Sequence, residues 1–209
     1  MGPVETYDFV AKYRRLWHLA HGDAWPGLQR HGLLSAAQLT MLLGDEDSAR
    51  PGTHRPVEVS LSHPEQGSAV LREQGPQHVA KLATAITDDM TVDKWLRLID
   101  AMAFFFPSEK AIEGLQRAYK DRPVIVLSVD TRSLVREYEH WIRIASSSSG
   151  SLLYRPATRG PDTFLSIRRF DHSKKTVREV GVVEGVPDLE NHLLTAERWE
   201  PDGGREKLG

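Results

Sequence analysis

Apolar residues recur at helical spacing through much of the first two-thirds of the chain, and residues that favour helix N-caps stand before several of these runs. Helices are therefore predicted in four places: 24–31 after Asp23, 35–43 with Ser35 as cap, and the segments that follow Thr91 and Ser108. Residues 68–88 also have helical spacing, with an interruption at Gly75-Pro76. This part of the chain is expected to be mainly helical.

Short apolar runs rich in β-branched or aromatic residues predict strands, most of them in the second half of the chain. The clearest is VIVLSVD at 124–130, since a continuous apolar run is typical of a central strand. Further strands are predicted at 16–20, within 57–62, and at 104–106, 152–154, 163–170 and 177–183. The last two are separated by DHSKKT, which suits a hairpin. Helices first and strands later indicate an α+β domain.

The chain has 209 residues, which is enough for one domain with a substantial core. We expect a single domain over 1–200, followed by a polar tail at 201–209. The polar stretch 44–56 is long for a connection inside a compact domain, so we expect it to act as a lid or an insertion.

Composition excludes several classes of function. The chain has no cysteine, which removes disulfides, thiolate zinc sites and cysteine nucleophiles. The formal net charge of −2 argues against non-specific nucleic-acid binding by the surface as a whole. No apolar stretch reaches the roughly 20 residues needed to span a bilayer, and the start MGPVETYD is unlike a signal peptide. We therefore expect a soluble, cytoplasmic protein with no membrane partner.

General motifs add little. The sequence contains no P-loop, no GxGxxG after a strand, no HExxH and no GxSxG. Its nine histidines do not have metal-ligand spacing, so no metal site is predicted. His18 and His21, the closest pair, stand three residues apart on an extended segment and are expected to point to opposite faces.

Three segments, taken in order, resemble the DarT-type DNA ADP-ribosyltransferases. WHLAHGDAWPGLQRHGLL (17–34) resembles the strand ending in Tyr-His-x-Thr-His, the short helix and the Gly-Leu of that family. MAFFFPSEKAIEGLQRAY (102–119) is similar to its aromatic strand and the helix after it. VREVGVVEGVP (177–187) is similar to the late strand that carries its catalytic glutamate. RGPDTF (159–164) and LREQGP (71–76) are similar to stretches of a bacterial branch with the same frame.

The resemblance implies an ADP-ribosyltransferase-like split mixed β-sheet with NAD bound in the cleft between its halves. Glu179 would be the catalytic carboxylate, which stabilises the positive charge that develops as the nicotinamide–ribose bond breaks. Residues implied to bind NAD are His18 at the adenosine ribose with His21 nearby, Phe105 or Phe106 against nicotinamide, and Arg72 at the pyrophosphate. Two departures weaken the match: Ala20 replaces the Thr of the first motif, and FFFP lacks the family's Tyr-Phe-Asn-Pro ending.

Each of these residues also has a structural interpretation. Glu179 alternates with Val180 and could lie on the solvated face of an edge strand. His18 could be a hydrogen-bonded strand histidine, the phenylalanines could be core, and Arg72 could be a surface arginine. The sequence leaves these alternatives open.

The functional hypothesis is an NAD-dependent ADP-ribosyltransferase that modifies a nucleic-acid base and acts as a toxin. A basic strip at the expected hairpin tip, Arg168, Arg169, Lys174 and Lys175, could guide a DNA or RNA backbone toward Glu179, or simply keep the hairpin soluble. An RNA 2′-phosphotransferase would need a basic cluster that the sequence does not offer. The other alternative is a catalytically degenerate module that binds a nucleotide, a nucleic acid or a protein partner without turnover.

Overall fold

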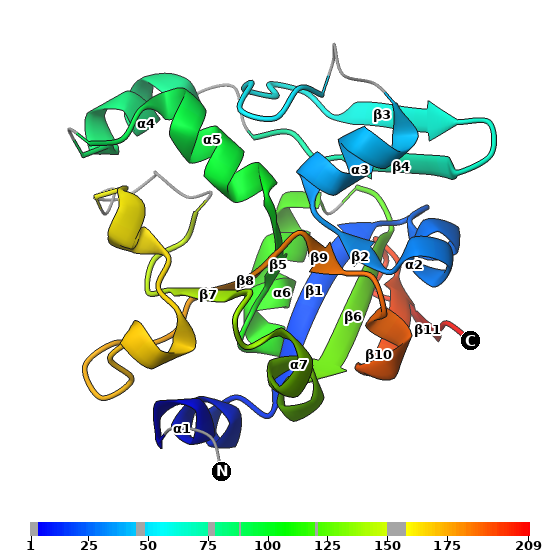
Figure 1. The fold of residues 1–209 in the computed structure, drawn as a ribbon. Coiled ribbons are helices and arrows are strands. Elements are labelled where there is room, and N and C mark those ends of the chain that lie inside the picture. Colours follow the sequence, from blue (N-terminus) through cyan, green and yellow to red (C-terminus); the bar gives the residue numbers. More distant parts are fainter. Residues whose placement is uncertain (1–3, 45–48, 75–77, 88, 120, 150–157) are drawn as a thin grey trace.

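The computed structural model describes residues 4–44, 49–74, 78–87, 89–119, 121–149 and 158–209, which form an α+β fold (Figure 1). The α-helices of the described residues are α1 Val4–Lys12, α2 Trp25–His31, α3 Ala36–Leu43, α4 His78–Ala85, α5 Val92–Asp100, α6 Glu109–Gln116 and α7 Thr131–Tyr138. They end by Tyr138, so the α+β class and the expected concentration of helices in the first two-thirds of the chain are confirmed.

The strands carry the rest of the architecture. They are β1 Arg15–His21, β2 Leu33–Leu34, β3 Val59–His63, β4 Gly67–Leu71, β5 Met102–Phe105, β6 Val124–Asp130, β7 Ile142–Ala145, β8 Glu179–Val183, β9 Gly185–Val186, β10 Leu193–Trp199 and β11 Arg205–Lys207. Single 3-10 turns lie at Arg117–Tyr119, Pro161–Thr163, Ile167–Arg169 and Leu189–Asn191.

Helix caps follow the sequence closely. The side chains of Ser35, Thr91, Ser108 and Asp130 each accept a hydrogen bond from the backbone N–H three residues later. Each thereby satisfies one of the N–H groups that the first turn of a helix leaves without an intrahelical partner. The exception is α2, where the N-cap is Ala24 rather than the expected Asp23, with no side-chain cap.

Two antiparallel sheets make the body of the molecule. One has the order β1-β6-β10-β11 and the other the order β5-β8-β7. β6 lies between β1 and β10, and its residues from Val124 to Val129 are buried, as the apolar run VIVLSVD predicts. Every pairing between named strands of the described residues is antiparallel, so the expectation of a mixed sheet is wrong.

The two sheets meet at a single point and then separate. Trp17 of β1 and Phe106, just after β5, exchange two backbone hydrogen bonds with N···O distances of 2.9 and 2.7 Å. Beyond this bridge β1 continues through His18–His21 without pairing to β5. The body is therefore a split sheet, and the split opens at His18.

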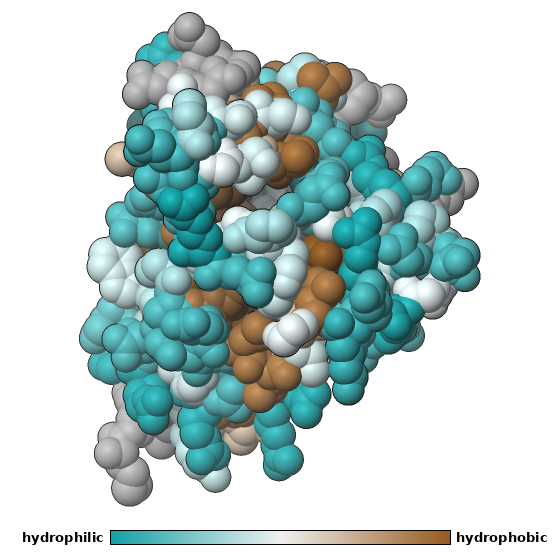
Figure 2. Space-filling view, turned by 90° about the vertical axis from the view of Figure 1, so that its right-hand side faces the viewer, coloured by the Kyte–Doolittle hydropathy of each residue, from teal (hydrophilic) through white to brown (hydrophobic). Residues whose placement is uncertain are grey.

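A small unit stands over the split. The two-stranded hairpin β3–β4 packs against α3 around Leu43, Ala49, Leu61 and Leu71, a cluster separate from the main core. We call α3 with the β3–β4 hairpin the covering unit; Figure 1 shows it above β1, β2 and β6. On the side of α2 and the hairpin tip, the surface is mostly hydrophilic with a band of apolar residues across its middle (Figure 2).

Strand β9 makes close backbone contacts with β2. β9 pairs with β2, and Gly185 has a φ of 112°, where L side chains are rarely found. A Cβ at Gly185 would stand 2.2 Å from the carbonyl oxygen of Leu33. Gly185 is therefore required for β2 and β9 to approach closely enough to pair.

Several sequence predictions are wrong. The run 163–170 contains one isolated β-bridge, from Leu165 to Ile144, and one 3-10 turn, Ile167–Arg169, so it is not a strand and forms no hairpin with 177–183. Residues 68–71, the start of the stretch expected to be helical, belong to β4. The strands β2, β7, β9, β10 and β11 were not predicted; β11 lies in the expected polar tail and pairs with β10. The predicted strand at 152–154, Gly75-Pro76 and part of the 44–56 loop lie outside the described residues.

Candidate functional site

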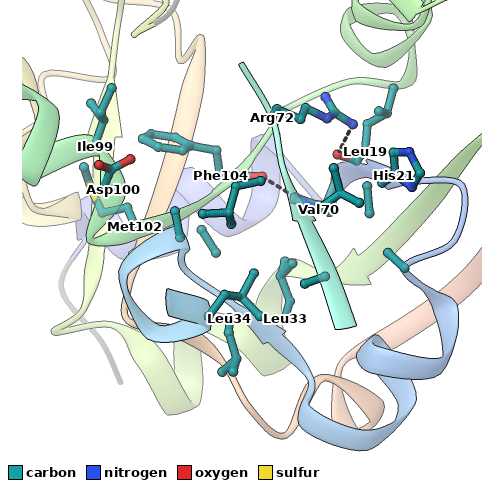
Figure 3. A pocket seen from close by; sticks show the side chains of 18 of the residues that line it. Leu19, His21, Leu33, Leu34, Val70, Arg72, Ile99, Asp100, Met102 and Phe104 are labelled. Carbon is teal, nitrogen blue, oxygen red and sulfur yellow. Dashed lines mark hydrogen bonds between the residues drawn. The ribbon is translucent and has the colours of Figure 1, made fainter. Parts of the chain in front are cut away.

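A large pocket lies where the two sheets separate, beneath the covering unit. It has a volume of about 1010 Å³ and is lined on one side by His18–His21 of β1 and on the other by Met102, Ala103 and Phe104 of β5. Residues of β2, α3 and β4 close it from above. Figure 3 shows side chains from these elements around the hollow. We call it the β1–β5 pocket.

His18 lies at the point where the split begins. Its Nδ1 is 2.7 Å from the carbonyl oxygen of Phe104, so the imidazole bridges β1 and β5 where backbone pairing stops. A carbonyl can only accept, which places the proton of the neutral ring on Nδ1 and leaves Nε2 as a hydrogen-bond acceptor. Burial, together with the positive charge of Arg72, lowers the pKa of His18 to about 4, and the hydrogen bond to Phe104 only partly opposes this decrease. The pocket therefore contains a neutral imidazole.

Glu179 lines the same pocket from the other sheet. It is the first residue of β8, which lies between β5 and β7, and its side chain is only 3 % exposed. The solvated edge-strand interpretation is therefore wrong. Burial raises the pKa of the carboxyl group, and hydrogen bonds from Ser149 and Ser148 oppose that rise. The backbone N–H of Ser149 donates to Oε2 at 2.8 Å, which fixes the orientation of the carboxylate.

The RGPDTF segment supports this carboxylate. Arg159, its first residue, is 1 % exposed and stacks over Trp95 with its guanidinium carbon 5.7 Å from the ring centroid. Its Nη2 donates to the carbonyl oxygen of Ser148, and its Nη1 to the hydroxyl of Ser147 at 3.2 Å. Arg159 thus holds the serine segment that hydrogen-bonds Glu179, and its positive charge favours the ionised carboxylate.

The three phenylalanines divide between the core and the pocket. Phe104 and Phe106 line the pocket, whereas Phe105 is fully buried in the main core, edge-on to His18 with ring centroids 5.9 Å apart. Successive side chains on a strand point to opposite faces, so only alternate residues can reach the split. Of the two phenylalanines that the resemblance places against nicotinamide, Phe106 lines the pocket and Phe105 does not.

The other two residues expected to bind NAD also line the pocket. The Nη2 of Arg72 donates to the carbonyl oxygen of Leu19 at 2.8 Å, and its guanidinium lies over the ring of Tyr119 at 4.4 Å (Figure 3). Burial lowers its pKa from the usual value, although the group stays charged at neutral pH. His21, at the end of β1, accepts from the N–H of Asp23 at 3.2 Å. Both histidines of the pair therefore reach the pocket, despite their spacing.

A buried ion pair forms another part of the wall. Arg55 and Asp100, both pocket residues, are 7 % and 2 % exposed, and Nη2 of Arg55 lies 2.9 Å from Oδ1 of Asp100. Gln74 and the N–H of Gly52 also donate to this carboxylate. The pair connects the segment before β3 to the end of α5. Sequence analysis missed it because no local pattern links residues 45 positions apart.

The basic strip is elsewhere. Arg168 and Arg169 line a separate, smaller pocket of about 310 Å³ with Glu139, His140 and Arg143, and neither lines the β1–β5 pocket. Arg168 pairs with Glu139 and Arg169 with Asp162. Lys174 pairs with Asp171, and neither Lys174 nor the exposed Lys175 is among the residues around the β1–β5 pocket.

Comparisons with known proteins give one finding. The model of DUF7002, described as a family of unknown function, matches residues 14–193. No curated protein and no solved structure matches the chain. In the part of the chain that the structure describes, no helix is long and apolar enough to cross a membrane, and no group of three or more His, Asp or Glu side chains is placed to hold a metal ion.

Proposed function

We propose that this chain, which belongs to DUF7002, a family of unknown function, is an NAD-dependent ADP-ribosyltransferase that works in the β1–β5 pocket. The proposal depends on one observation: His18 and Glu179, 161 positions apart and on different sheets, line the same pocket. These are the two residues that the resemblance assigns to NAD binding and to catalysis. The split between the two sheets supports an ADP-ribosyltransferase-like fold, whereas their antiparallel pairing departs from the mixed sheet that the resemblance implies.

The groups on the pocket wall suit NAD. In the neutral His18 ring, Nε2 accepts a hydrogen bond from a ribose hydroxyl of the adenosine, and the acceptor is retained across neutral pH because the pKa is about 4. Phe106 offers an aromatic face for nicotinamide. Arg72 adds a buried positive charge for the pyrophosphate. The volume of about 1010 Å³ lies at the upper end of the roughly 300–1,000 Å³ typical of small-molecule sites.

In the proposed reaction, the bond between C1′ of the ribose and the nicotinamide nitrogen breaks, and its electron pair leaves with neutral nicotinamide. The Glu179 carboxylate hydrogen-bonds a ribose hydroxyl and stabilises the positive charge that develops on the sugar. A nucleophile of the acceptor then bonds to C1′ and gives up its proton. The fixed carboxylate, oriented by Ser149, needs little reorganisation during this step.

Nicotinamide release tests the proposal. Wild-type protein incubated with NAD, in the presence of single-stranded DNA, RNA, protein or small-molecule acceptors, is expected to release nicotinamide. Glu179→Gln should abolish release, whereas Glu190→Gln, a change at an exposed glutamate outside the pocket lining, should leave it unchanged. If neither the wild type nor either variant releases nicotinamide with any acceptor, the proposal of an ADP-ribosyltransferase is refuted.

The choice of acceptor is a separate part of the proposal. A nucleic-acid base is the acceptor that the resemblance implies, but the basic strip lies outside the β1–β5 pocket, so its position adds no support. Relief of toxicity by Glu179→Gln on expression would favour the toxin hypothesis.

A binding module without turnover is the second candidate. It is favoured by Ala20, which lines the pocket where a hydroxyl is expected from the family pattern. Calorimetry separates the two: NAD binding that His18→Asn weakens, without nicotinamide release by the wild type, would identify the module.

A further inference from the structure

One wall of the β1–β5 pocket is aliphatic. Its residues come from α2, β2, α3 and β4, and we call them the aliphatic wall: Leu28, Leu33, Leu34, Leu39, Leu43 and Val70. Figure 3 shows Leu33 and Leu34 across the hollow from Arg72 and His21, whereas Val70 lies on the side of Leu19 and His21.

Part of the aliphatic wall lies outside the apolar clusters that the described residues form. Leu34 and Val70 are half-buried and belong to none of these clusters, whereas Leu39, also half-buried, packs against the cluster of the covering unit. Apolar surface left facing water costs roughly 25 cal/mol per Å², and a ligand that covers it recovers this free energy. The wall contributes no charged or hydrogen-bonding side chain, so it favours a ligand with an apolar body.

NAD alone does not account for this wall. The ribose and pyrophosphate groups of a dinucleotide are polar along most of their length and need donors and acceptors, which His18, Glu179 and Arg72 supply. At about 1010 Å³ the pocket is large enough for a second compact molecule beside the dinucleotide.

We propose that the aliphatic wall binds the acceptor of the reaction, and that this acceptor is an apolar small molecule carrying a hydroxyl group. The inference rests on the proposed function. The acceptor oxygen bonds to C1′ as the bond from C1′ to nicotinamide breaks, the electron pair leaves with nicotinamide, and the hydroxyl proton passes to Glu179 or to solvent. The product is an O-glycoside of the acceptor, in which C1′ of the ADP-ribosyl group carries the acceptor oxygen in place of nicotinamide.

Straight-chain alcohols from hexanol to decanol are suitable probes. Their affinity, measured by calorimetry or ligand-detected NMR with and without NAD, should rise about fourfold per added methylene until the wall is covered, which corresponds to about 0.8 kcal/mol per CH₂. Leu34→Glu and Val70→Glu should each lower the affinity for decanol at least tenfold and leave NAD binding within twofold. Val57→Glu, at a side chain that is 66 % exposed and outside the pocket lining, is the matched control.

Turnover gives the second readout. In the presence of NAD, the longer alcohols should accelerate nicotinamide release and yield an ADP-ribosyl O-glycoside detectable by mass spectrometry, and Leu34→Glu should suppress this acceleration. A single-stranded oligonucleotide and RNA are run in parallel.

Three outcomes would overturn the inference and identify the reason. Competition between decanol and NAD would show that NAD itself occupies the wall. Transfer to the oligonucleotide or RNA but to none of the alcohols would show a nucleic-acid acceptor, with the proposed function intact. Alcohol binding without any NAD binding or nicotinamide release would refute the proposed function, and the acceptor role with it.

Discussion

The imidazole of His18 makes one contact in the structure and a second one in the proposed function. Nδ1 donates to Phe104 at the point where β1 and β5 stop pairing, so the ring takes the place of the next backbone contact between the two sheets. Nε2 is then the acceptor on the pocket side of the site. An Asn side chain at position 18 places an amide N–H near the position of Nδ1 and can keep the hydrogen bond to Phe104. A Gln side chain reaches the position of Nε2 and can keep the proposed contact with NAD. The two variants therefore distinguish the two contacts.

His18 is expected to make folding stability depend on pH. Its pKa is about 4 in the folded chain, against 6.5 for the ordinary side chain. Unfolded protein therefore binds the extra proton between these values, so the stabilisation is complete above pH 6.5 and is lost as the pH falls toward 4, by about 3 kcal/mol for this shift. Urea unfolding at pH 7 and pH 4.5 should show a smaller acid loss in His18→Asn than in wild type. The exposed His140→Asn is the control, and equal losses in all three proteins would contradict the prediction.

Glu179 is expected to change folding stability with pH in the opposite direction to His18. Its pKa is raised, so the folded chain keeps a proton that the unfolded chain releases, and stability falls as the pH rises through this window. Glu179→Gln should therefore have a higher urea midpoint than wild type at pH 7, with the difference disappearing near pH 4. Gln can still accept from the N–H of Ser149, so the loop is retained. A lower midpoint at pH 7 would indicate that the carboxylate stabilises the fold.

The sequence identified these two residues but not their support. His18 and Glu179 stand within recognisable segments, whereas the RGPDTF stretch was noticed without a role for its arginine. The function of Arg159 depends on its contacts with Ser147 and Ser148, which only tertiary structure brings against β8. Alternation along 104–106 could have shown that Phe104 and Phe106 share a face and that Phe105 does not.

At the level of elements, prediction worked where local signals were strong. The capped helices and β6 were found because a cap or a continuous apolar run specifies them locally. β10 was missed because LLTAERW alternates weakly and carries charged residues, although pairing to β6 and β11 makes it a strand. β4 was interpreted as helical because GSAVL is compatible with either period, and its partner β3 determined the outcome.

The Arg55–Asp100 pair is expected to hold the covering unit to α5. Asp100→Asn leaves the buried guanidinium of Arg55 without its counter-charge. We expect this variant to lower the free energy of unfolding by about 3–5 kcal/mol, the usual cost of removing one partner of a buried ion pair. The matched control is Asp93→Asn in the exposed pair with Arg97 on the same helix, where a loss below about 1 kcal/mol is expected. Similar losses for the two variants would show that the buried pair adds nothing beyond an exposed one.

On the scale of the whole molecule, the pocket exists because two antiparallel sheets share one bridge and then diverge beneath a separately packed unit. The covering unit has its own apolar cluster. Arg72, directly after β4, donates to the carbonyl of Leu19 in β1, and His31 of α2 contacts the carbonyl of Gln66 in the turn of the β3–β4 hairpin. The stability of the covering unit is therefore expected to differ from that of β6, which is buried and paired on both sides.

Hydrogen exchange tests this difference. Amides of β3 and β4 should exchange faster than those of β6, because segments with few contacts to the main core open by local rather than global unfolding. NAD, if it binds between the sheets, should slow exchange in β4 next to Arg72, while Asp100→Asn should speed it in β3 and β4 and leave β6 unchanged. Mass spectrometry of peptides covering 59–71 and 124–130 measures all of these. Equal protection of the two peptides in the free protein would mean that the covering unit opens only with the whole fold, and ligand entry would then require another path.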